Sequence, residues 1–550
     1  MLAAGLAICG HGEAQTLPSP AVPNAGSILQ QKQSESRGQT PLDNTGQPGV
    51  PAAQGLARRY HVKDIRFVGN GKLSEAELAP LVQKYIGRDV SDQDLERIAE
   101  QISSEYRRNG YGFTFTSVDP AGLADGHVKF VIVEGKAGKV RLSNHSRVRQ
   151  ALLEGMLDAF RAHPDHSDAL ERASLLMSDI PGVAAARPRL SRGEEGGTVD
   201  VDVDVQPAPL FNGYASIDNY GSRTSGRTRL NAMLGINNPF GWGDALRLNV
   251  SGFPFGQDRG DSTLGGFTYD FPIGSSGLRG GFGYNRLQYD LGGVYAGQFD
   301  GTADVWSAYA SYPIVRQQTR NLSARVTYSH SAYKDSQVGF DNKRKTDAVA
   351  AALYGSAQDT LFGLSGTNQF SATYTVGDLR YDSPLFAGQD AAGAQTAGGY
   401  SKLELAVSRT QQLTYSTYLR AEVQGQYAFK NLDGSARMVM GGPSAVRAFS
   451  SDFVSVDSGI LLKTAAGWRL PIALPVSVSV FYETAAGVLR HDPLAGQPNN
   501  VNLQGAGVSL DASYRSVTAS LSFATRVGGN APGIDQQPKS WTWLSLAYSF

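Results

Sequence analysis

The sequence lacks any run of about 18 apolar residues, the length that would indicate a membrane-spanning helix. Cysteine is almost absent, because Cys9 is the only one in 550 residues. If a leader that contains Cys9 is removed, the mature chain has no thiol, which fits an oxidising compartment without requiring one. The sequence also contains no Gly-x-Ser-x-Gly, no phosphate-binding P-loop and no dinucleotide fingerprint. We therefore expect neither an enzyme nor a bound cofactor.

An excess of charge of either sign is also missing. Lys and Arg together number 50, as do Asp and Glu, so the formal net charge is zero. A nucleic-acid-binding protein usually carries a basic patch or a clear excess of positive charge. We therefore expect no nucleic-acid partner.

Two groups of residues resemble metal ligands only in part. Asp200, Asp202 and Asp204 alternate along one segment, but they lack the glycine and the later bidentate glutamate of a calcium loop. His163 and His166 flank a proline and have no further ligands nearby in the sequence. A half-exposed strand explains the acids and a surface loop explains the histidines, so we expect no metal.

Glycine and aromatic residues are plentiful, with 64 Gly, 24 Tyr and 23 Phe. Glycine suits bends and turns, and Tyr and Phe suit the interfacial girdles of a membrane barrel. A soluble β-sandwich shares this composition, so the order of the residues has to decide between the two.

The last ten residues form an alternating pattern. Counted back from the end, every second residue is apolar: Phe550, Tyr548, Leu546 and Leu544. A barrel in an outer membrane needs a last strand that closes against the first and turns one apolar face to lipid. A soluble closed barrel can end in the same way, so the other strands must distinguish the two.

The same alternation extends over the carboxyl-terminal part of the chain. From Phe211 onward, about 340 residues read as strands of roughly ten, separated by turn residues. In one of them Leu246, Leu248 and Val250 alternate with polar residues. The polar face recurs in strand after strand, and no large hydrophobic core is left for a soluble barrel. We distinguish about sixteen segments, an even number that is enough for a water-filled lumen.

The amino-terminal residues are of a different kind. A short apolar run followed by Gly12-Glu13-Ala14 predicts a signal peptide over residues 1–14. Residues 15–58 are rich in Pro, Gln, Gly and Ser and are expected to be mostly disordered. Within them, residues 24–35 offer a capping Asn and helix-tolerant residues that include Ile28 and Leu29. A helix this short is marginal in water and needs a cavity to hold it, so plain disorder is the alternative.

Two α+β modules are predicted between this segment and the barrel. In the first, over residues 59–136, His61–Val68 alternates like a strand, and Ser74 and Ser91 each cap a helix. In the second, over residues 137–206, helices are expected near Val148–Phe160 and Ser167–Ser178. A strand with strict alternation over residues 199–205 ends this module.

Several motifs in this order carry a resemblance to a known family. They are Tyr106–Tyr111 with the pattern Tyr-x-x-x-Gly-Tyr, Val131–Gly135, Leu175–Val183, Asp218–Ser222 and Asn237–Asp244. The layout resembles two-partner-secretion transporters, within the superfamily of outer-membrane barrel insertases. The resemblance implies a mainly β fold. It consists of a 16-stranded transmembrane antiparallel β-barrel over residues 207–550, preceded by two periplasmic α+β POTRA domains and an N-terminal plug helix.

The most specific match lies in a loop expected to fold back into the lumen, over residues 431–455. Its tip, Val446, Arg447, Ala448 and Phe449, is similar to the superfamily's Val-Arg-Gly-Tyr element. The residues Phe481 and Glu483 resemble the Phe-x-Asp of the barrel wall that answers it, and alternation turns both into the lumen. The resemblance implies an ion pair between Arg447 and Glu483. Ala448 replaces the usual Gly and Glu483 the usual Asp, which puts the geometry of the tip in question.

The resemblance also implies a function. It predicts a channel in the outer membrane of a Gram-negative bacterium, with its POTRA domains in the periplasm and lipid around the barrel. The channel would recognise the N-terminal secretion domain of a large unfolded exoprotein, such as a haemolysin or an adhesin, and export it. No small-molecule substrate is expected. An insertase that assembles other barrels shares the loop motif, and a passive porin shares the barrel, so both remain alternatives.

Overall fold

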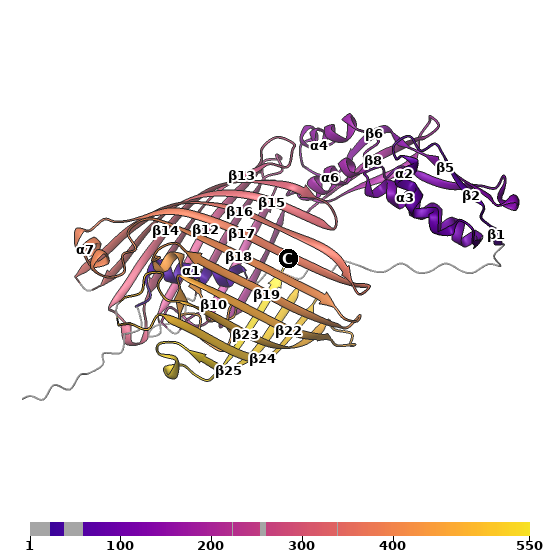
Figure 1. The fold of residues 1–550 in the computed structure, drawn as a ribbon. Coiled ribbons are helices and arrows are strands. Elements are labelled where there is room, and N and C mark those ends of the chain that lie inside the picture. The colour runs from indigo at the N-terminus through magenta and orange to yellow at the C-terminus, as the bar shows by residue number, and fades with distance from the viewer. Residues whose placement is uncertain (1–21, 38–58, 223, 253–259, 338, 495) are drawn as a thin grey trace, which may run out of the picture.

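The structure is a computed structural model that describes residues 22–37, 59–222, 224–252, 260–337, 339–494 and 496–550. The signal peptide expected over residues 1–14, and the linker on either side of residues 22–37, lie outside the described residues. A helix, two α/β modules and a closed barrel follow one another along the chain (Figure 1). In the part of the chain that is described, no helix is both long enough and apolar enough to span a membrane.

The first module packs two helices on a three-stranded sheet. Its elements are β1 (Arg59–His61), β2 (Asp64–Val68), α2 (Glu75–Val82), η1 (Gln83–Tyr85), β3 (Asp89–Ser91), α3 (Asp92–Arg108), β4 (Phe115–Asp119), η2 (Leu123–Asp125) and β5 (His127–Val133). The single strand expected over His61–Val68 is wrong, because the chain bends at Val62. This residue is buried and its N–H donates to Arg88, so β1 pairs with β3 whereas β2 pairs with β5.

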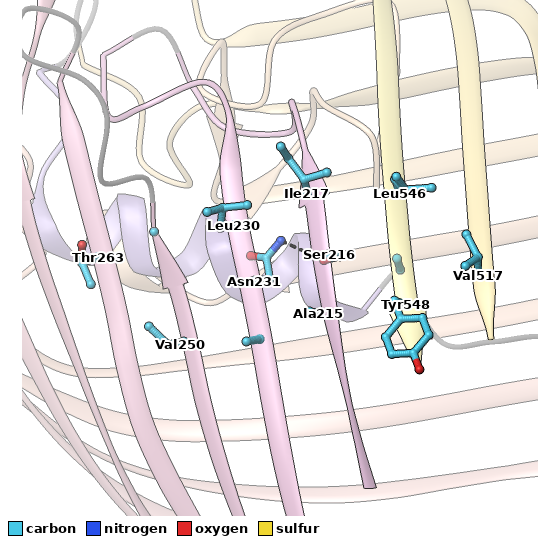
Figure 2. Close-up of a pocket in the computed structure, with 13 residues that line it drawn as sticks. Ala215, Ser216, Ile217, Leu230, Asn231, Val250, Thr263, Val517, Leu546 and Tyr548 are labelled. Carbon is cyan, nitrogen blue, oxygen red and sulfur yellow. Dashed lines mark hydrogen bonds between the residues drawn. The ribbon is translucent and has the colours of Figure 1, made fainter. Parts of the chain in front are cut away.

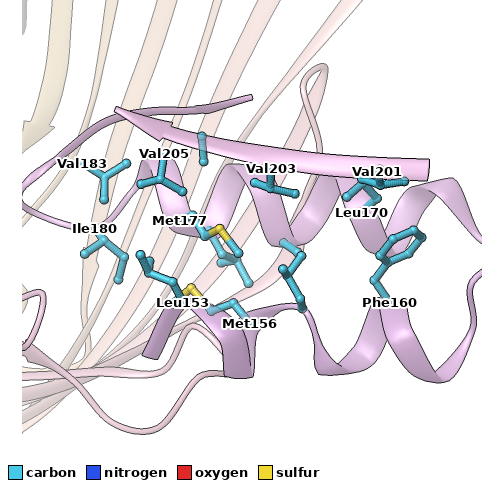
Figure 3. Close-up of a cluster of buried hydrophobic side chains, with 14 of the residues drawn as sticks. Leu153, Met156, Phe160, Leu170, Met177, Ile180, Val183, Val201, Val203 and Val205 are labelled. Atoms are coloured by element: carbon cyan, nitrogen blue, oxygen red, sulfur yellow. The ribbon is translucent and has the colours of Figure 1, made fainter. Parts of the chain in front are cut away.

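The second module repeats this topology. Its elements are β6 (Lys136–Asn144), α4 (Gln150–Met156), α5 (Asp158–Ala162), α6 (Ser167–Ser178), β7 (Val183–Arg192) and β8 (Thr198–Pro207). In both three-stranded sheets the first strand, β2 or β6, lies parallel to the last, β5 or β8, which sits in the middle of the sheet. Side chains such as Leu153, Phe160 and Met177 fill the space between helices and sheet (Figure 3). The one helix expected near Val148–Phe160 is wrong, since the chain turns at the buried Leu157 and forms two short helices.

Sixteen antiparallel strands close into a barrel after the second module. They are β9 (Phe211–Asp218), β10 (Arg229–Asn237), β11 (Ala245–Gly252), β12 (Asp261–Pro272), β13 (Arg279–Asp290), β14 (Phe299–Arg316), β15 (Arg320–Gln337), β16 (Phe340–Leu361), β17 (Leu364–Tyr381), β18 (Gly398–Gln412), β19 (Thr417–Ala428), β22 (Ser458–Arg469), β23 (Val476–Val488), β24 (Asn500–Tyr514), β25 (Val517–Asn530) and β26 (Ser540–Ser549). Each pairs with its neighbour in sequence order, and β26 returns to β9. The predicted fold class is confirmed.

The shorter elements between the barrel strands are η3 (Gly293–Tyr295), α7 (Pro384–Ala392), η4 (Gly434–Ala436), β20 (Met438–Val439), β21 (Ser455–Val456) and η5 (Ile534–Gln536). The helix α7 follows β17 and lies at the end of the barrel away from the α/β modules (Figure 1). The strands β14 to β17 contain 18 to 22 residues each. Because a tilted strand crosses a bilayer in about 9–11 residues, these four extend beyond it.

The two faces of the last strand differ as the alternation predicts. Leu544, Leu546, Tyr548 and Phe550 point outward and are 46–57% exposed. Trp541 and Trp543 are buried on the inner side. On the outer wall, a hollow of about 660 Å³ with an almost wholly apolar lining crosses the seam where β26 meets β9 (Figure 2). The outer surface is therefore apolar across the closure of the barrel, as a lipid-facing wall requires.

Candidate functional site

The lumen loop, residues 431–455, connects β19 to β22 and folds into the barrel. After its first turn, β20 pairs with β21 as a short hairpin. Its tip is a compact turn, in which the N–H of Val446 donates to Met440 and the N–H of Gly442 donates to Phe449. Val446 and Phe449 are fully buried, and Phe449 stacks on Phe453 with ring centroids 5.4 Å apart. The tip is thus a small folded unit packed on the inner wall.

Arg447 at this tip contacts Glu483 on β23 by two routes. The backbone N–H of Arg447 donates to Oε2 of Glu483, and its Nε donates to Oε1, each at 2.7 Å. Glu483 is fully buried, and both of its carboxylate oxygens accept from this one residue. Phe481, two residues earlier on the same inner face, lies under the guanidinium at 3.4 Å from its carbon to the ring centroid. A desolvated charge pair of this kind is short and directional.

Arg447 has further hydrogen bonds to three other strands of the barrel wall. Nη1 donates to Ser509 on β24 at 2.8 Å and to Ser522 on β25 at 3.4 Å. The indole N–H of Trp543 on β26 donates to the backbone carbonyl of Arg447 at 2.8 Å. The alternation of each strand predicts that Ser509, Ser522 and Trp543 face inward. Nothing in the sequence predicts that they contact this loop.

The two departures from the family pattern are accommodated by local geometry. Ala448 does not adopt a positive φ, so a side chain at this position causes no backbone strain. The longer side chain of Glu483 reaches both the backbone and the guanidinium of Arg447. The tip also packs closely on the wall at Gly505, because a Cβ added there would lie only 2.7 Å from the Cβ of Ala448.

The helix α1 (Ala25–Arg37) lies inside the barrel (Figure 1). Asn24 caps it by accepting the N–H of Ser27 at 2.9 Å on its side-chain oxygen. Ala25, Ile28 and Leu29 are buried on one side of the helix. They pack against inward-facing wall residues Leu287, Tyr289, Leu291, Ala303 and Tyr333. The cavity that so short a helix requires is therefore the barrel lumen.

The joint between the two α/β modules involves the Tyr-x-x-x-Gly-Tyr motif. Gly110 has φ +86°, which favours glycine, and its carbonyl accepts the N–H of Ser167 at 2.8 Å. The ring of Tyr111 lies against His166, with centroids 5.0 Å apart. Lys72 of the first module donates to Asp165 of the second at 2.6 Å. This bond lowers the pKa of the Asp165 carboxyl and raises the pKa of the Lys72 ammonium.

The second module is fixed to the barrel at its nearer end. The guanidinium of Arg316, at the end of β14, donates twice to the carboxylate of Asp179, each time at 2.8 Å. Arg172 on α6 donates to the carbonyl of Pro313 at 2.7 Å. The fork-like geometry of the first pair fixes orientation as well as distance, so the module is held in one position on the rim of the barrel.

The three alternating aspartates of the second module have partners within the protein. Asp204 pairs with Arg189, Asp202 accepts from Ser143, and Asp200 accepts a backbone N–H. Among the described residues, no group of three or more His, Cys, Asp or Glu is placed to hold a metal ion.

The comparison with protein families decides the identity of the barrel. Residues 197–512 match the profile of the haemolysin secretion/activation proteins ShlB, FhaC and HecB. The chain belongs to this family. Residues 60–135 match the ShlB-type POTRA domain, so the first α/β module is a POTRA domain. The protein is therefore an outer-membrane transporter of the two-partner-secretion type, with its POTRA domains in the periplasm.

Curated relatives agree with this assignment. The chain is 29% identical over 548 residues to the heme/hemopexin transporter protein HuxB of Haemophilus influenzae, covering 96% of this chain and 95% of that protein. It is 22% identical to the outer membrane transporter CdiB of Dickeya dadantii, over 83% of this chain and 81% of the relative. It is 23% identical to the hemolysin transporter protein ShlB of Serratia marcescens, over 85% and 82%.

Solved structures show the same fold. CdiB from Escherichia coli aligns with a TM-score of 0.69 at 18% identity, covering 98% of this chain and 100% of that one. BamA from Haemophilus ducreyi, in a form lacking POTRA domains 1–3, aligns with a TM-score of 0.52 at 14% identity, covering 89% and 100%. At these identities the likeness concerns the fold. The choice of a secretion channel over an insertase or a porin therefore rests on the family match and not on these structures.

Proposed function

We propose that this protein carries one large exoprotein, in an unfolded state, from the periplasm through the barrel lumen to the cell surface. The observation that carries the proposal is a closed barrel whose lumen holds a helix and a folded loop, with two α/β modules fixed at its periplasmic mouth. Because the exported partner would fold only after it has left the barrel, its folding can give transport a direction without nucleotide hydrolysis. No small-molecule substrate enters this scheme.

Capture of the partner is assigned to free sheet edges of the two modules. Both β2 and β6 lie at an edge of their sheets, where an extended peptide can add a strand. The opposite edges are partly occupied by serine hydroxyls of the preceding helices. Ser103 accepts the N–H of Thr116 on β4 at 3.1 Å, and Ser178 accepts the N–H of Ala186 on β7 at 3.0 Å. We therefore favour β2, and the part of β6 that follows Ala137, as the edges that bind the secretion domain, because the N–H of Ala137 already donates to Pro164 at 2.8 Å.

Gating is assigned to α1 and the lumen loop, which block the lumen at rest and move during transport. The helix is held by a small apolar contact with the wall and by a few hydrogen bonds, such as those of Ala25 to Asp335 and of Lys32 to Ser262, which can be broken and remade without unfolding the barrel. Deletion of residues 24–37 is expected to raise single-channel conductance in planar bilayers. An unchanged conductance in a correctly inserted barrel would rule out the plug.

The class of partner is proposed from the relatives. The heme/hemopexin transporter matches at 29% identity over 96% of this chain, whereas the ShlB and CdiB relatives match at 22–23% over smaller parts. This difference favours an exoprotein that acts on heme or hemopexin, with a haemolysin or another exoprotein as the alternative. Co-expression with secretion domains of each class, followed by measurement of the exported fraction, distinguishes them.

Photo-crosslinking tests the route directly. A photoreactive residue at Thr327, which faces the lumen on β15, is expected to crosslink a partner stalled by a folded fusion domain. The same residue at Val326, which faces lipid on that strand, serves as the matched control. In the first module, a photoreactive residue at Arg66 on β2 should crosslink the secretion domain, while one at Glu96 on the exposed face of α3 should not. Equal crosslinking at Thr327 and Val326 would contradict passage through the lumen.

A further inference from the structure

A buried arginine lies between the two elements that occupy the lumen. Arg344 is on β16 and is only 2% exposed. Its Nη1 donates to the carboxylate of Asp335 on β15, and its Nε forms an ion pair with Asp433 in the lumen loop at 3.2 Å. The guanidinium also lies over the ring of Tyr333, 5.1 Å from the centroid. One cation thus joins a carboxylate of the wall to a carboxylate of the loop.

The Asp335 side of this cluster holds the amino-terminal end of α1. Oδ1 of Asp335 accepts the backbone N–H of Ala25 at 2.7 Å and the hydroxyl of Tyr289 at 2.6 Å. The first N–H groups of a helix have no partner within the helix and favour a negative charge nearby. The carboxylate that pairs with Arg344 therefore also fixes the position of the helix.

The Asp433 side holds the beginning of the lumen loop. Oδ2 of Asp433 accepts the N–H and the hydroxyl of Ser435, at 2.9 and 2.7 Å. The helix packs directly on this turn, because a Cβ added at Gly26 would lie 2.7 Å from the Cβ of Ser435. Helix and loop therefore share both a packing contact and the charge of Arg344.

We propose that Arg344 is a positioning residue that couples α1 to the lumen loop, so that neither leaves its resting place alone. Withdrawal of α1 removes one donor from Asp335 and admits water to the cluster. Water weakens the attraction between Arg344 and Asp433 and so loosens the adjoining loop. Displacement of the loop leaves Arg344 with Asp335 alone and uncovers the helix in the same way. The inference rests on the proposed blocking of the lumen by these two elements.

The coupling is measured with a spin label on the loop. The label is placed at a cysteine replacing Ser444, in a chain with Cys9 replaced by serine, and the mobile fraction is compared with and without residues 24–37. In the parent background, deletion of the helix is expected to raise the mobile fraction at least about fivefold, the lower end of usual coupling strengths. In Arg344→Gln the loop is expected to be mobile already, and deletion should change the fraction by less than about twofold.

Arg279→Gln is the matched control, because Arg279 pairs with Asp270 in the wall and contacts neither α1 nor the lumen loop. In this variant, deletion of residues 24–37 should raise the mobile fraction of the loop as much as it does in the parent. Asp433→Asn breaks only the loop side and should also abolish the effect, which covers the case that Arg344→Gln assembles poorly. Heat-dependent migration on gels reports whether each barrel is folded.

Two outcomes would overturn the coupling: an immobile loop after helix deletion in the parent, or an equal response to deletion in the parent and in both cluster variants. Single-channel conductance is recorded on the same samples. If the deletion mobilises the loop but leaves conductance unchanged, the coupling stands and the proposed blocking of the pore fails.

Discussion

Trp543 donates its indole N–H to the backbone carbonyl of Arg447 at 2.8 Å, and so ties the last strand of the barrel to the tip of the lumen loop. On the other side of the seam, Tyr220 packs against the ring of Trp543 at 6.0 Å between centroids, and its carbonyl accepts the hydroxyl of Ser451. The strands β26 and β9 are joined by five residue pairs, whereas β25 and β26 share nine. The last strand therefore pairs less extensively with β9 than with β25, and the loop contacts both sides of the pairing between β26 and β9.

Replacing Trp543 by Phe tests this contact. The substitution keeps an aromatic ring beside Trp541, which stacks on Trp543 at 5.2 Å, but it removes the N–H donor together with part of a buried indole ring. We expect the docked tip to lose about 1–2 kcal/mol from leaving the carbonyl of Arg447 without its partner, and the cavity beside the smaller ring adds to this loss. Increased cleavage of the loop by an external protease measures the loss. Tyr548→Phe, on the outer face of the same strand, is the control and should leave cleavage unchanged.

Arg447→Ala should have a much larger effect. It leaves the buried Glu483 with an uncompensated charge, and removing one partner of such a pair costs roughly 3–5 kcal/mol. We expect a barrel that inserts but secretes poorly, measured as exported partner protein per folded channel. Arg447→Lys keeps the charge but carries its donors on one nitrogen, whereas Nε and Nη1 of Arg447 reach Glu483 and Ser509 separately, so it should preserve secretion only in part. Unchanged secretion by a stably inserted Arg447→Ala barrel would contradict a role for the pair.

The sequence was sufficient for those features that depend on local periodicity. Alternation along β23 predicted that Phe481 and Glu483 face the lumen, and alternation along β26 predicted the outward face of Tyr548 and Phe550. It could not predict the break at Leu157, because the apolar spacing continues through it. Nor could it identify Arg344, whose partners lie on a neighbouring strand and in a loop about 90 residues away. Contacts across a closed barrel depend on register and shear, which no local pattern encodes.

The close packing of the loop tip on Gly505 gives a third prediction. Gly505→Ala places a Cβ against Ala448, so the tip must shift or the wall must give, at a cost of about 1–3 kcal/mol. We expect weaker docking of the loop, seen as faster proteolysis and reduced secretion. Ala448→Gly removes the opposing Cβ and should restore docking when combined with Gly505→Ala. Gly425→Ala on the outer face of β19, where the nearest atom is 3.6 Å away, is the control. Failure of the combined variant to recover would show that the clash is not at Ala448.

The joint between the two α/β modules should be insensitive to pH over the physiological range. The pKa of Asp165 is lowered by its bond from Lys72, so its contribution is present above the ordinary value of 3.8 and is lost only as pH falls through the lowered value. The pKa of Lys72 is raised, so its contribution is present below 10.5 and is lost as pH rises beyond that.

Pulsed electron spin resonance between labels on α2 and α4 measures the joint as a distribution of distances. We expect equal distributions at pH 7 and at about pH 5, since both pKa values lie outside this window. Asp165→Asn should broaden the distribution at both pH values by removing the ion pair with Lys72. Lys129→Met, which breaks the pair with Asp119 inside the first module, is the control and should not broaden it. Broadening of the parent distribution between pH 7 and pH 5 would contradict a joint held by the Lys72–Asp165 pair.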